Sequence, residues 1–275
     1  MLSYQHEYHA GNHADVLKHA ALATLIRALQ GKPTPLRVID CHAGSGVYDL
    51  QGDLAQRGRE FETGIGRIFA AAGAPEAILP YLDVVLELNP DRVLRRYPGS
   101  PEIALRLLRP TDQLELFELH PRAIAALRSR YGREPRVHVH SRDAFEGLVG
   151  VVPPNERRGI ALIDPAYETS DEYRRVPEIV AAALSRWANG IFLVWYPRIR
   201  RAGTERLLAE LSKLDVARRF RVELSPCPES AGLTGSGLVI LNPPYQADLA
   251  LVGLLRWLDA KLGSSMHSRW SAGWI

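Results

Sequence analysis

A short apolar run that ends in a polar turn is the feature that most restricts how this chain can fold. Residues 159–163 read GIALI, and Asp164-Pro165-Ala166-Tyr167 follow directly. A continuous apolar run of this length predicts a strand that is covered on both faces, as in a parallel sheet. In open sheets of that kind ligands bind where the strands end. The sequence therefore predicts a ligand site at Asp164.

Similar strand patterns recur along the chain and alternate with helical patterns. Strand patterns occur at Val38–Ile39, Leu114–Phe117, Arg136–His140, Gly190–Trp195, Phe220–Leu224 and Gly237–Leu241. Strands that alternate with helices indicate an α/β fold with a parallel sheet. We expect a seven-stranded, doubly wound, Rossmann-like sheet, in which the last strand returns through a hairpin and is antiparallel.

Two segments lie outside this alternation. Residues 1–31 form an N-terminal extension, whose helix is expected to be capped by Asn12 and to end near Gly31. The segment from about residue 50 to 97 is longer than one crossover between neighbouring strands requires. It contains helical patterns at Glu60–Ala72 and Ala77–Leu88. We therefore expect one domain over residues 1–275 with a small helical insertion.

The composition argues against disulfide-stabilised, metal-binding, secreted and membrane-spanning proteins. The net charge is only +3, and the two cysteines, Cys41 and Cys227, have neither metal-ligand spacing nor a disulfide framework. His9 and His13 share a helical spacing, but the acidic partners of a common metal motif are missing. The N-terminus does not read as a signal peptide, and no apolar run is long enough to span a membrane. We expect a cytoplasmic monomer without a metal.

A glycine-rich turn follows the first expected strand. Gly44 and Gly46 let the backbone approach a ligand closely, but Asp49 stands where a dinucleotide fingerprint needs a third glycine. This departure argues against nicotinamide-dependent reduction. Asp40 enters the turn as an acidic residue, which favours S-adenosylmethionine because the amino-acid part of that cofactor is cationic.

Acidic residues also follow the second and third expected strands. Glu118 lies where such sheets commonly accept ribose hydroxyls, and Asp143 lies where the adenine amino group of the cofactor is expected. Either residue alone could be a solvated charge at a strand end. Their order before Asp164 supports the cofactor interpretation. Ser100 precedes Pro101 and is expected to cap a helix beside the same site.

The tetrad at Asp164 resembles Asp-Pro-Pro-Tyr, a motif of methyltransferases that modify an exocyclic amino group on a flat ring. Such a nitrogen is a poor nucleophile because its lone pair is delocalised into the ring. The Asp164 carboxylate and the Pro165 carbonyl can hold its hydrogens, and Tyr167 can supply a stacking face. Ala166 replaces the second proline, at an expected cost of about 0.4–1 kcal/mol of preorganisation. An ordinary Asp-Pro turn is the alternative.

Nearly the whole chain resembles the ribosomal RNA large subunit methyltransferase J family. The resemblance rests on Tyr4 and on the blocks HAGNHADVLKH (9–19), HAG (42–44), YPGSP (97–101), ELHP (118–121) and WYP (195–197). It implies transfer of a methyl group from S-adenosylmethionine to N6 of an adenine in 23S ribosomal RNA. The residues that it implies for the cofactor are His19, His42, Ser100, Glu118, Asp143, Ala144 and Asp164. It further implies Asp164 as the catalytic residue and Tyr4 as an RNA contact.

Several alternatives remain open at this point. The chain could instead methylate a DNA adenine or a protein glutamine amide, or it could bind cofactor and RNA without catalysis. A second tetrad, Asn242-Pro243-Pro244-Tyr245, keeps both prolines, but it follows the antiparallel strand and should lie at the opposite edge of the sheet. Arg198, Arg200 and Arg201 are the first candidates for RNA contacts.

Overall fold

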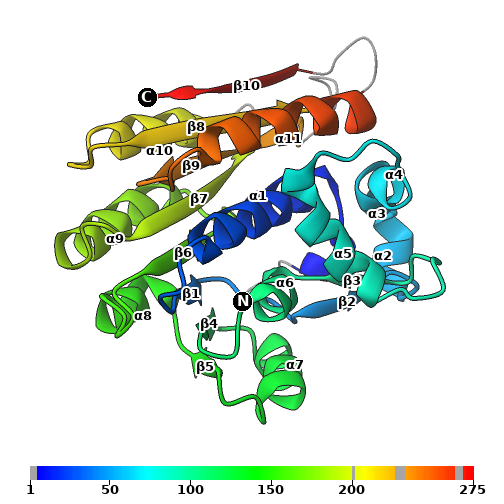
Figure 1. Cartoon of the computed structure of the whole chain (residues 1–275), viewed down its shortest axis with the longest axis horizontal. Helices are drawn as coiled ribbons and strands as arrows, with labels where there is room; N and C mark the ends of the chain where they lie inside the picture. Colours follow the sequence, from blue (N-terminus) through cyan, green and yellow to red (C-terminus); the bar gives the residue numbers. More distant parts are fainter. Residues whose placement is uncertain (1–4, 200–201, 227–232, 264–268) are drawn as a thin grey trace.

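A single eight-stranded sheet forms the centre of the molecule. The computed structural model describes residues 5–199, 202–226, 233–263 and 269–275. The strand order is β10-β8-β9-β7-β6-β1-β4-β5 (Figure 1). The strands are β1 (Arg37–Asp40), β4 (Gln113–Glu118), β5 (Val137–Ser141), β6 (Gly159–Ile163), β7 (Ile191–Arg198), β8 (Arg219–Ser225), β9 (Gly235–Leu241) and β10 (Arg269–Trp274).

Strand direction divides the sheet into two parts. Strands β1, β4, β5, β6 and β7 run parallel, whereas β9 is antiparallel to both β7 and β8. The expected Rossmann-like sheet with an antiparallel last strand is therefore confirmed over seven strands. Strand β10 adds an eighth, which pairs antiparallel with β8 and was not predicted.

Helices cover both faces of the sheet (Figure 1). One face carries α1 (His13–Gln30), α5 (Leu79–Glu87), α6 (Ser100–Leu107), α7 (Pro121–Tyr131) and α11 (Ala247–Leu262). The other face carries α8 (Ala144–Val151), α9 (Glu172–Arg186) and α10 (Ala202–Ser212). Because apolar side chains of β6 and β7 enter both cores, these strands read as continuous apolar runs.

Helix α1 lies across the middle of its face, between α6 and α11. Its N-cap is Asn12, as expected, and the Asn12 side chain accepts hydrogen bonds from the backbone N–H groups of Ala14 and Asp15. The helix is apolar almost all round, which is typical of a helix buried in the core. Its first turns also bury Asp15 and Lys18, and these charges face the carboxyl ends of the parallel strands.

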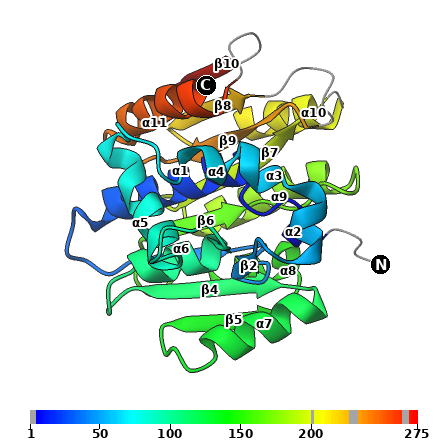
Figure 2. The ribbon, with the colours of Figure 1, turned by 90° about the vertical axis from the view of Figure 1, so that its right-hand side faces the viewer.

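The segment between β1 and β4 contains short helices and a small two-stranded sheet (Figure 2). Its helices before α5 are α2 (Asp53–Gly58), α3 (Glu60–Thr63), α4 (Ile65–Ile68) and the 3₁₀ helix η2 (Glu76–Ile78). Strands β2 (Val47–Asp49) and β3 (Arg96–Pro98) pair antiparallel at its base. A further 3₁₀ helix, η1 (His6–Tyr8), contacts α2.

The helical pattern at Glu60–Ala72 forms two short helices, α3 and α4, because the helix is interrupted at Gly64. Gly64 packs against the backbone that enters α1: a Cβ atom there would lie 2.1 Å from the Gly11 carbonyl oxygen and 2.6 Å from the Asn12 carbonyl carbon. The backbone N–H of Ile65 donates a hydrogen bond to the same Gly11 oxygen, at 2.8 Å. A tertiary contact therefore overrides the local helical pattern.

This close approach predicts opposite effects for two glycine-to-alanine substitutions. Gly64→Ala should lower the free energy of unfolding by about 1–3 kcal/mol, because the new methyl group overlaps backbone atoms that cannot move aside. Gly253→Ala, on the exposed side of α11 with no atom within 4 Å of the new Cβ, should raise it by about 0.5–1 kcal/mol. Urea unfolding measures both values. Equal effects at the two positions would contradict this packing.

Candidate active site

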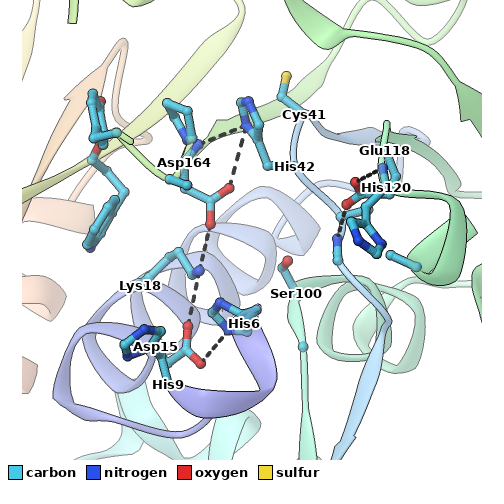
Figure 3. Close-up of a pocket in the computed structure, with 18 of the residues that line it drawn as sticks. His6, His9, Asp15, Lys18, Cys41, His42, Ser100, Glu118, His120 and Asp164 are labelled. Carbon is cyan, nitrogen blue, oxygen red and sulfur yellow. Dashed lines mark hydrogen bonds and ion pairs between the residues drawn. The ribbon is translucent and has the colours of Figure 1, made fainter. Parts of the chain in front are cut away.

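A cavity of about 930 Å³ opens along the carboxyl ends of the parallel strands. Figure 3 shows side chains from α1, from the turns after β1 and β4, and from the end of β6 that point into it. Its size is at the upper end for small-molecule sites. The residues predicted from sequence that line it are His19, His42, Ser100, Glu118, Asp143, Ala144, Asp164, Pro165 and Tyr167. The structure thus brings together every described residue that was predicted to bind the cofactor or the acceptor base.

The glycine-rich turn after β1 holds the carboxylate at the end of β4. Gly44 and Gly46 have φ angles of +61° and +80°, a region that favours glycine. The Gly44 N–H donates to Oε2 of Glu118 at 2.8 Å, and the N–H groups of Leu119 and His120 donate to Oε1 at 2.7 Å each. Three backbone donors therefore orient Glu118, and one acceptor position, on Oε2, stays available to a ligand.

Asp143 connects the end of β5 to α8 and α9. Its Oδ1 accepts a hydrogen bond from the Phe145 N–H at 2.9 Å and so caps α8, while its Oδ2 accepts one from Arg175 at 3.0 Å. The Arg175 guanidinium also lies 4.2 Å from the centre of the Phe145 ring. Ala144 is buried beside this pair. Arg175 was not predicted from the sequence.

Asp164 follows β6 and is held by two residues that lie far from it in the sequence. Its Oδ2 accepts a hydrogen bond from Nζ of Lys18 at 2.6 Å, and its backbone N–H donates to Nδ1 of His42 at 3.3 Å. Partial burial lowers the pKa of His42, which favours the neutral ring. Because Nδ1 accepts this bond, it carries no proton for Oδ1 of Asp164, 3.9 Å away. Oδ1 is buried and has no hydrogen-bond partner among the residues that the structure describes.

Lys18 also contacts a second carboxylate. Its Nζ lies 3.1 Å from Oδ1 of Asp15, and Oδ2 of Asp15 lies 2.9 Å from Nε2 of His6 and 3.0 Å from the Gly11 N–H. Burial alone would raise the pKa of Asp15, but the neighbouring His6, Lys18 and His19 hold it well below its usual range. Asp15 is therefore ionised at neutral pH. Neither Asp15 nor the contact of Lys18 with Asp164 was predicted.

His19 belongs to a buried polar chain behind the cavity. Its Nδ1 lies 2.8 Å from the Tyr97 hydroxyl, which in turn lies 3.0 Å from the Tyr81 hydroxyl. Burial lowers the pKa of His19 to about 3, so the ring is neutral. Both Lys18 and His19 are buried.

Two expectations for individual side chains need correction or refinement. Ser100 is the first residue of α6 and not its cap; Gly99 takes the N-cap position, and the cap lacks a side-chain hydrogen bond. The Tyr167 ring lines the cavity but is only 3% exposed. It packs 4.5 Å from the Tyr173 ring, and its hydroxyl donates to the Trp195 carbonyl at 2.9 Å. Stacking of a base on Tyr167 stays a prediction.

The φ angle of Tyr167 is +52°, which is uncommon for a bulky residue and costs about 1–3 kcal/mol. Such strain concentrates at functional sites. Pro165 and Ala166 both line the cavity, and Pro165 is buried whereas Ala166 is exposed. The cost of replacing the second proline by Ala166 stays a prediction.

Asn242 lies at the opposite edge of the sheet, as the antiparallel direction predicted. Leu241, the residue before it, pairs with Phe192 near the start of β7. The Asn242 amide donates to the carbonyls of Ala188 and Gly190, at 2.8 and 2.9 Å. Asn242 thus joins the end of β9 to the turn before β7.

The remaining sequence predictions have different outcomes. Tyr4, Arg200, Arg201 and Cys227 lie outside the described residues. Arg198 pairs with Glu223 at 3.3 Å and is 40% exposed. Nδ1 of His9 contacts Glu60 at 2.9 Å, and the described residues contain no group of three His, Cys, Asp or Glu side chains arranged to hold a metal. In the same part of the chain, every helix is too short or too polar to cross a membrane.

Asp40, at the end of β1, lies behind the cavity and is almost fully buried. Burial, followed by the charge of Asp164, raises the pKa of Asp40 from 3.8 to about 7. Between these values the folded chain keeps a proton that the unfolded chain releases. The contribution of Asp40 to folding stability therefore falls as the pH rises through this window and levels off above it.

The variant Asp40→Asn cannot release this proton, so its melting temperature relative to the wild type should rise from about pH 4 to about pH 7. Thermal unfolding of both proteins across this range measures the difference. Titrating groups that do not interact with Asp40 contribute equally to both proteins. A difference that stays constant with pH would contradict the raised pKa of Asp40.

Sequence comparisons relate this chain to known proteins. Residues 33–275 match the family model described as "Ribosomal RNA large subunit methyltransferase D, RlmJ". The chain is 39% identical to Ribosomal RNA large subunit methyltransferase J of Escherichia coli, over 100% of this chain and 99% of that protein. It is 36% identical to the protein of the same name from Haemophilus influenzae, with the same coverage.

A crystal structure of a protein from Legionella pneumophila superposes with a TM-score of 0.90 at 34% identity, and the match covers 96% of this chain and 98% of that one. The matched family model and the full-length relatives lead to one conclusion. The chain belongs to the RlmJ family of ribosomal RNA large subunit methyltransferases.

Proposed function

We propose that this protein transfers a methyl group from S-adenosylmethionine to N6 of an adenine in 23S ribosomal RNA. Membership of the RlmJ family supports methylation of ribosomal RNA. One structural observation carries the choice of an amino group as acceptor. Asp164 ends β6 in the same cavity as the glycine-rich turn, with Oδ2 fixed by Lys18 and Oδ1 without a partner among the described residues.

The residues around the cavity fit the parts of the cofactor. Glu118, oriented by three backbone N–H groups, would accept a hydrogen bond from a ribose hydroxyl through its free position on Oε2. Asp143 and Ala144 would receive the adenine ring. The N-terminus of α6 at Ser100 and the neutral His19 lie where the amino-acid part would extend. S-adenosylmethionine supplies an electrophilic methyl group on a sulfonium centre.

Asp164 and Pro165 prepare the acceptor nitrogen. The Asp164 carboxylate and the Pro165 carbonyl would each accept one amino hydrogen, which localises the nitrogen lone pair toward the cofactor. Methylation makes the nitrogen cationic, and Oδ1 of Asp164 can then take the surplus proton. Lys18, 2.6 Å from Oδ2, keeps the carboxylate in one orientation through this transfer.

An adenine must leave its stack to reach Asp164. Extrusion costs a few kcal/mol, and an unpaired or mismatched base reduces that cost. The exposed Arg122 and Arg142 line the mouth of the cavity and can contact RNA phosphates. Arg198 remains a candidate only if RNA displaces it from Glu223.

The alternatives differ from this proposal in their substrates. A DNA adenine carries the same amino group, whereas a glutamine amide has no aromatic ring to stack. An aspartate at position 164 favours adenine over an amide. A monomeric state, independence of metals and a place in the cytoplasm belong to the same proposal.

The proposal predicts opposite results for the two tetrads. Asp164→Ala should reduce methyl transfer by about 10²-fold or more, because the nitrogen loses its main acceptor. Asn242→Ala should leave kcat within a few-fold, although it removes two hydrogen bonds and costs about 1–3 kcal/mol of stability.

Labelled methyl transfer to 23S RNA, followed by mass spectrometry of the nucleosides, measures both variants. Circular dichroism controls for folding, and DNA and protein substrates test the alternatives. An inactive Asn242→Ala beside an active Asp164→Ala would overturn the assignment. If the label were found only in DNA or only in glutamine, that molecule would be the substrate instead of 23S RNA.

A further inference from the structure

Lys18 is shared by two buried carboxylates (Figure 3). Its Nζ lies 2.6 Å from Oδ2 of Asp164 and 3.1 Å from Oδ1 of Asp15. The side chains of Lys18, Asp164 and Asp15 are only 8%, 7% and 3% exposed. Solvent therefore screens these charges weakly, and each contact is stronger than a surface ion pair.

Asp15 is itself firmly anchored. Its backbone N–H is capped by Asn12, and Oδ2 accepts a hydrogen bond from the Gly11 N–H at 3.0 Å and contacts His6 at 2.9 Å. It also lies in the first turn of α1, where the helix dipole stabilises a negative charge. Asp15 is thus a fixed point on α1, whereas Asp164 lies on the turn after β6.

A lysine side chain needs a second contact to hold its ammonium in one place. Its stem has four rotatable methylene groups, and the ammonium has no preferred direction of its own. Without Asp15, Lys18 would still contact Asp164, but the two side chains could move together. Asp15 therefore limits the movement of both Lys18 and the Asp164 carboxylate.

We propose that Asp15 is a positioning residue for methyl transfer. It shares the Lys18 ammonium with Asp164 and so fixes the Asp164 carboxylate, which accepts a hydrogen bond from the adenine amino group. This inference rests on the proposed function. Asp15 acts through Lys18, and its contact with His19, 3.9 Å from Oδ1 to Nε2, is too long for a hydrogen bond. The binding of the cofactor should therefore depend on Asp15 little, while the rate of the chemical step depends on it strongly.

The variant Asp15→Asn keeps the size of the side chain and an oxygen for the Gly11 N–H, but it removes the charge that faces Lys18. We expect kcat to fall about 10- to 100-fold, since small displacements of a reacting group have costs of this size. The dissociation constant of S-adenosylmethionine, measured by calorimetry, should change little.

Glu60→Gln is the matched control. Glu60 contacts His9 and the Asn12 amide at the same end of α1, at 2.9 Å each, but it does not line the cavity. Its substitution should lower stability and leave kcat near the wild-type value. An equal loss of kcat in both variants would mean that Asp15 only stabilises the start of α1, and would overturn the proposal.

A double-mutant cycle tests whether Asp15 acts through Lys18. In a Lys18→Met background, adding Asp15→Asn should cause no further loss of single-turnover rate. Losses that multiply would show that Asp15 acts independently of Lys18, which contradicts the proposal.

Nuclear magnetic resonance of the lysine ammonium groups gives a measurement that needs no reaction. Lys18 is buried, whereas Lys32, Lys213 and Lys261 are exposed or half-exposed, so only Lys18 should show slow hydrogen exchange with water. That signal should persist in Glu60→Gln and broaden in Asp15→Asn. An unchanged signal in Asp15→Asn would overturn the proposal. A wild-type protein that shows this signal but methylates no RNA would instead refute the proposed function.

Discussion

The burial of Lys18 between Asp15 and Asp164 ties the first helix to the edge of the sheet where the cavity opens. Taking three charges out of water is costly, and buried ion pairs contribute little net stability. What the contact fixes is position: it sets where the start of α1 meets the end of β6. The remaining apolar face of α1 then packs between α6 and α11. The cavity wall thus depends on a contact between residues that are 146 positions apart.

Strand direction accounts for the rest of the site. Because β1, β4, β5 and β6 run parallel, the residues after them meet at one edge: the glycine turn, Glu118, Asp143 and Asp164. The antiparallel β9 leads its own tetrad, at Asn242, to the other edge. A motif with both prolines is therefore structural here, while the one with an alanine lies at the site. The direction of the preceding strand, and not the match to the motif, therefore decides which tetrad lies at the site.

The sequence predicted the features that depend on local pattern. Apolar runs located the strands, and polar residues after them located Glu118, Asp143 and Asp164. Features that depend on packing were missed: the contacts of Lys18 and Arg175 join distant elements, and the break at Gly64 depends on the Gly11 backbone. Strand β10, with the sequence RWSAGW, lacks the branched residues that mark the inner strands. Ser100 was misplaced by one residue because Gly99 adopts the extended cap conformation.

The central claim is that Asp164 and the cofactor share one cavity at the carboxyl edge of the sheet. A crystal structure of the protein with S-adenosylhomocysteine and adenosine tests this most directly. We expect the ribose of the cofactor product to bind Glu118, and its sulfur to face an adenosine amino group held by Asp164. A cofactor bound at the Asn242 edge, or with its sulfur directed away from Asp164, would contradict it.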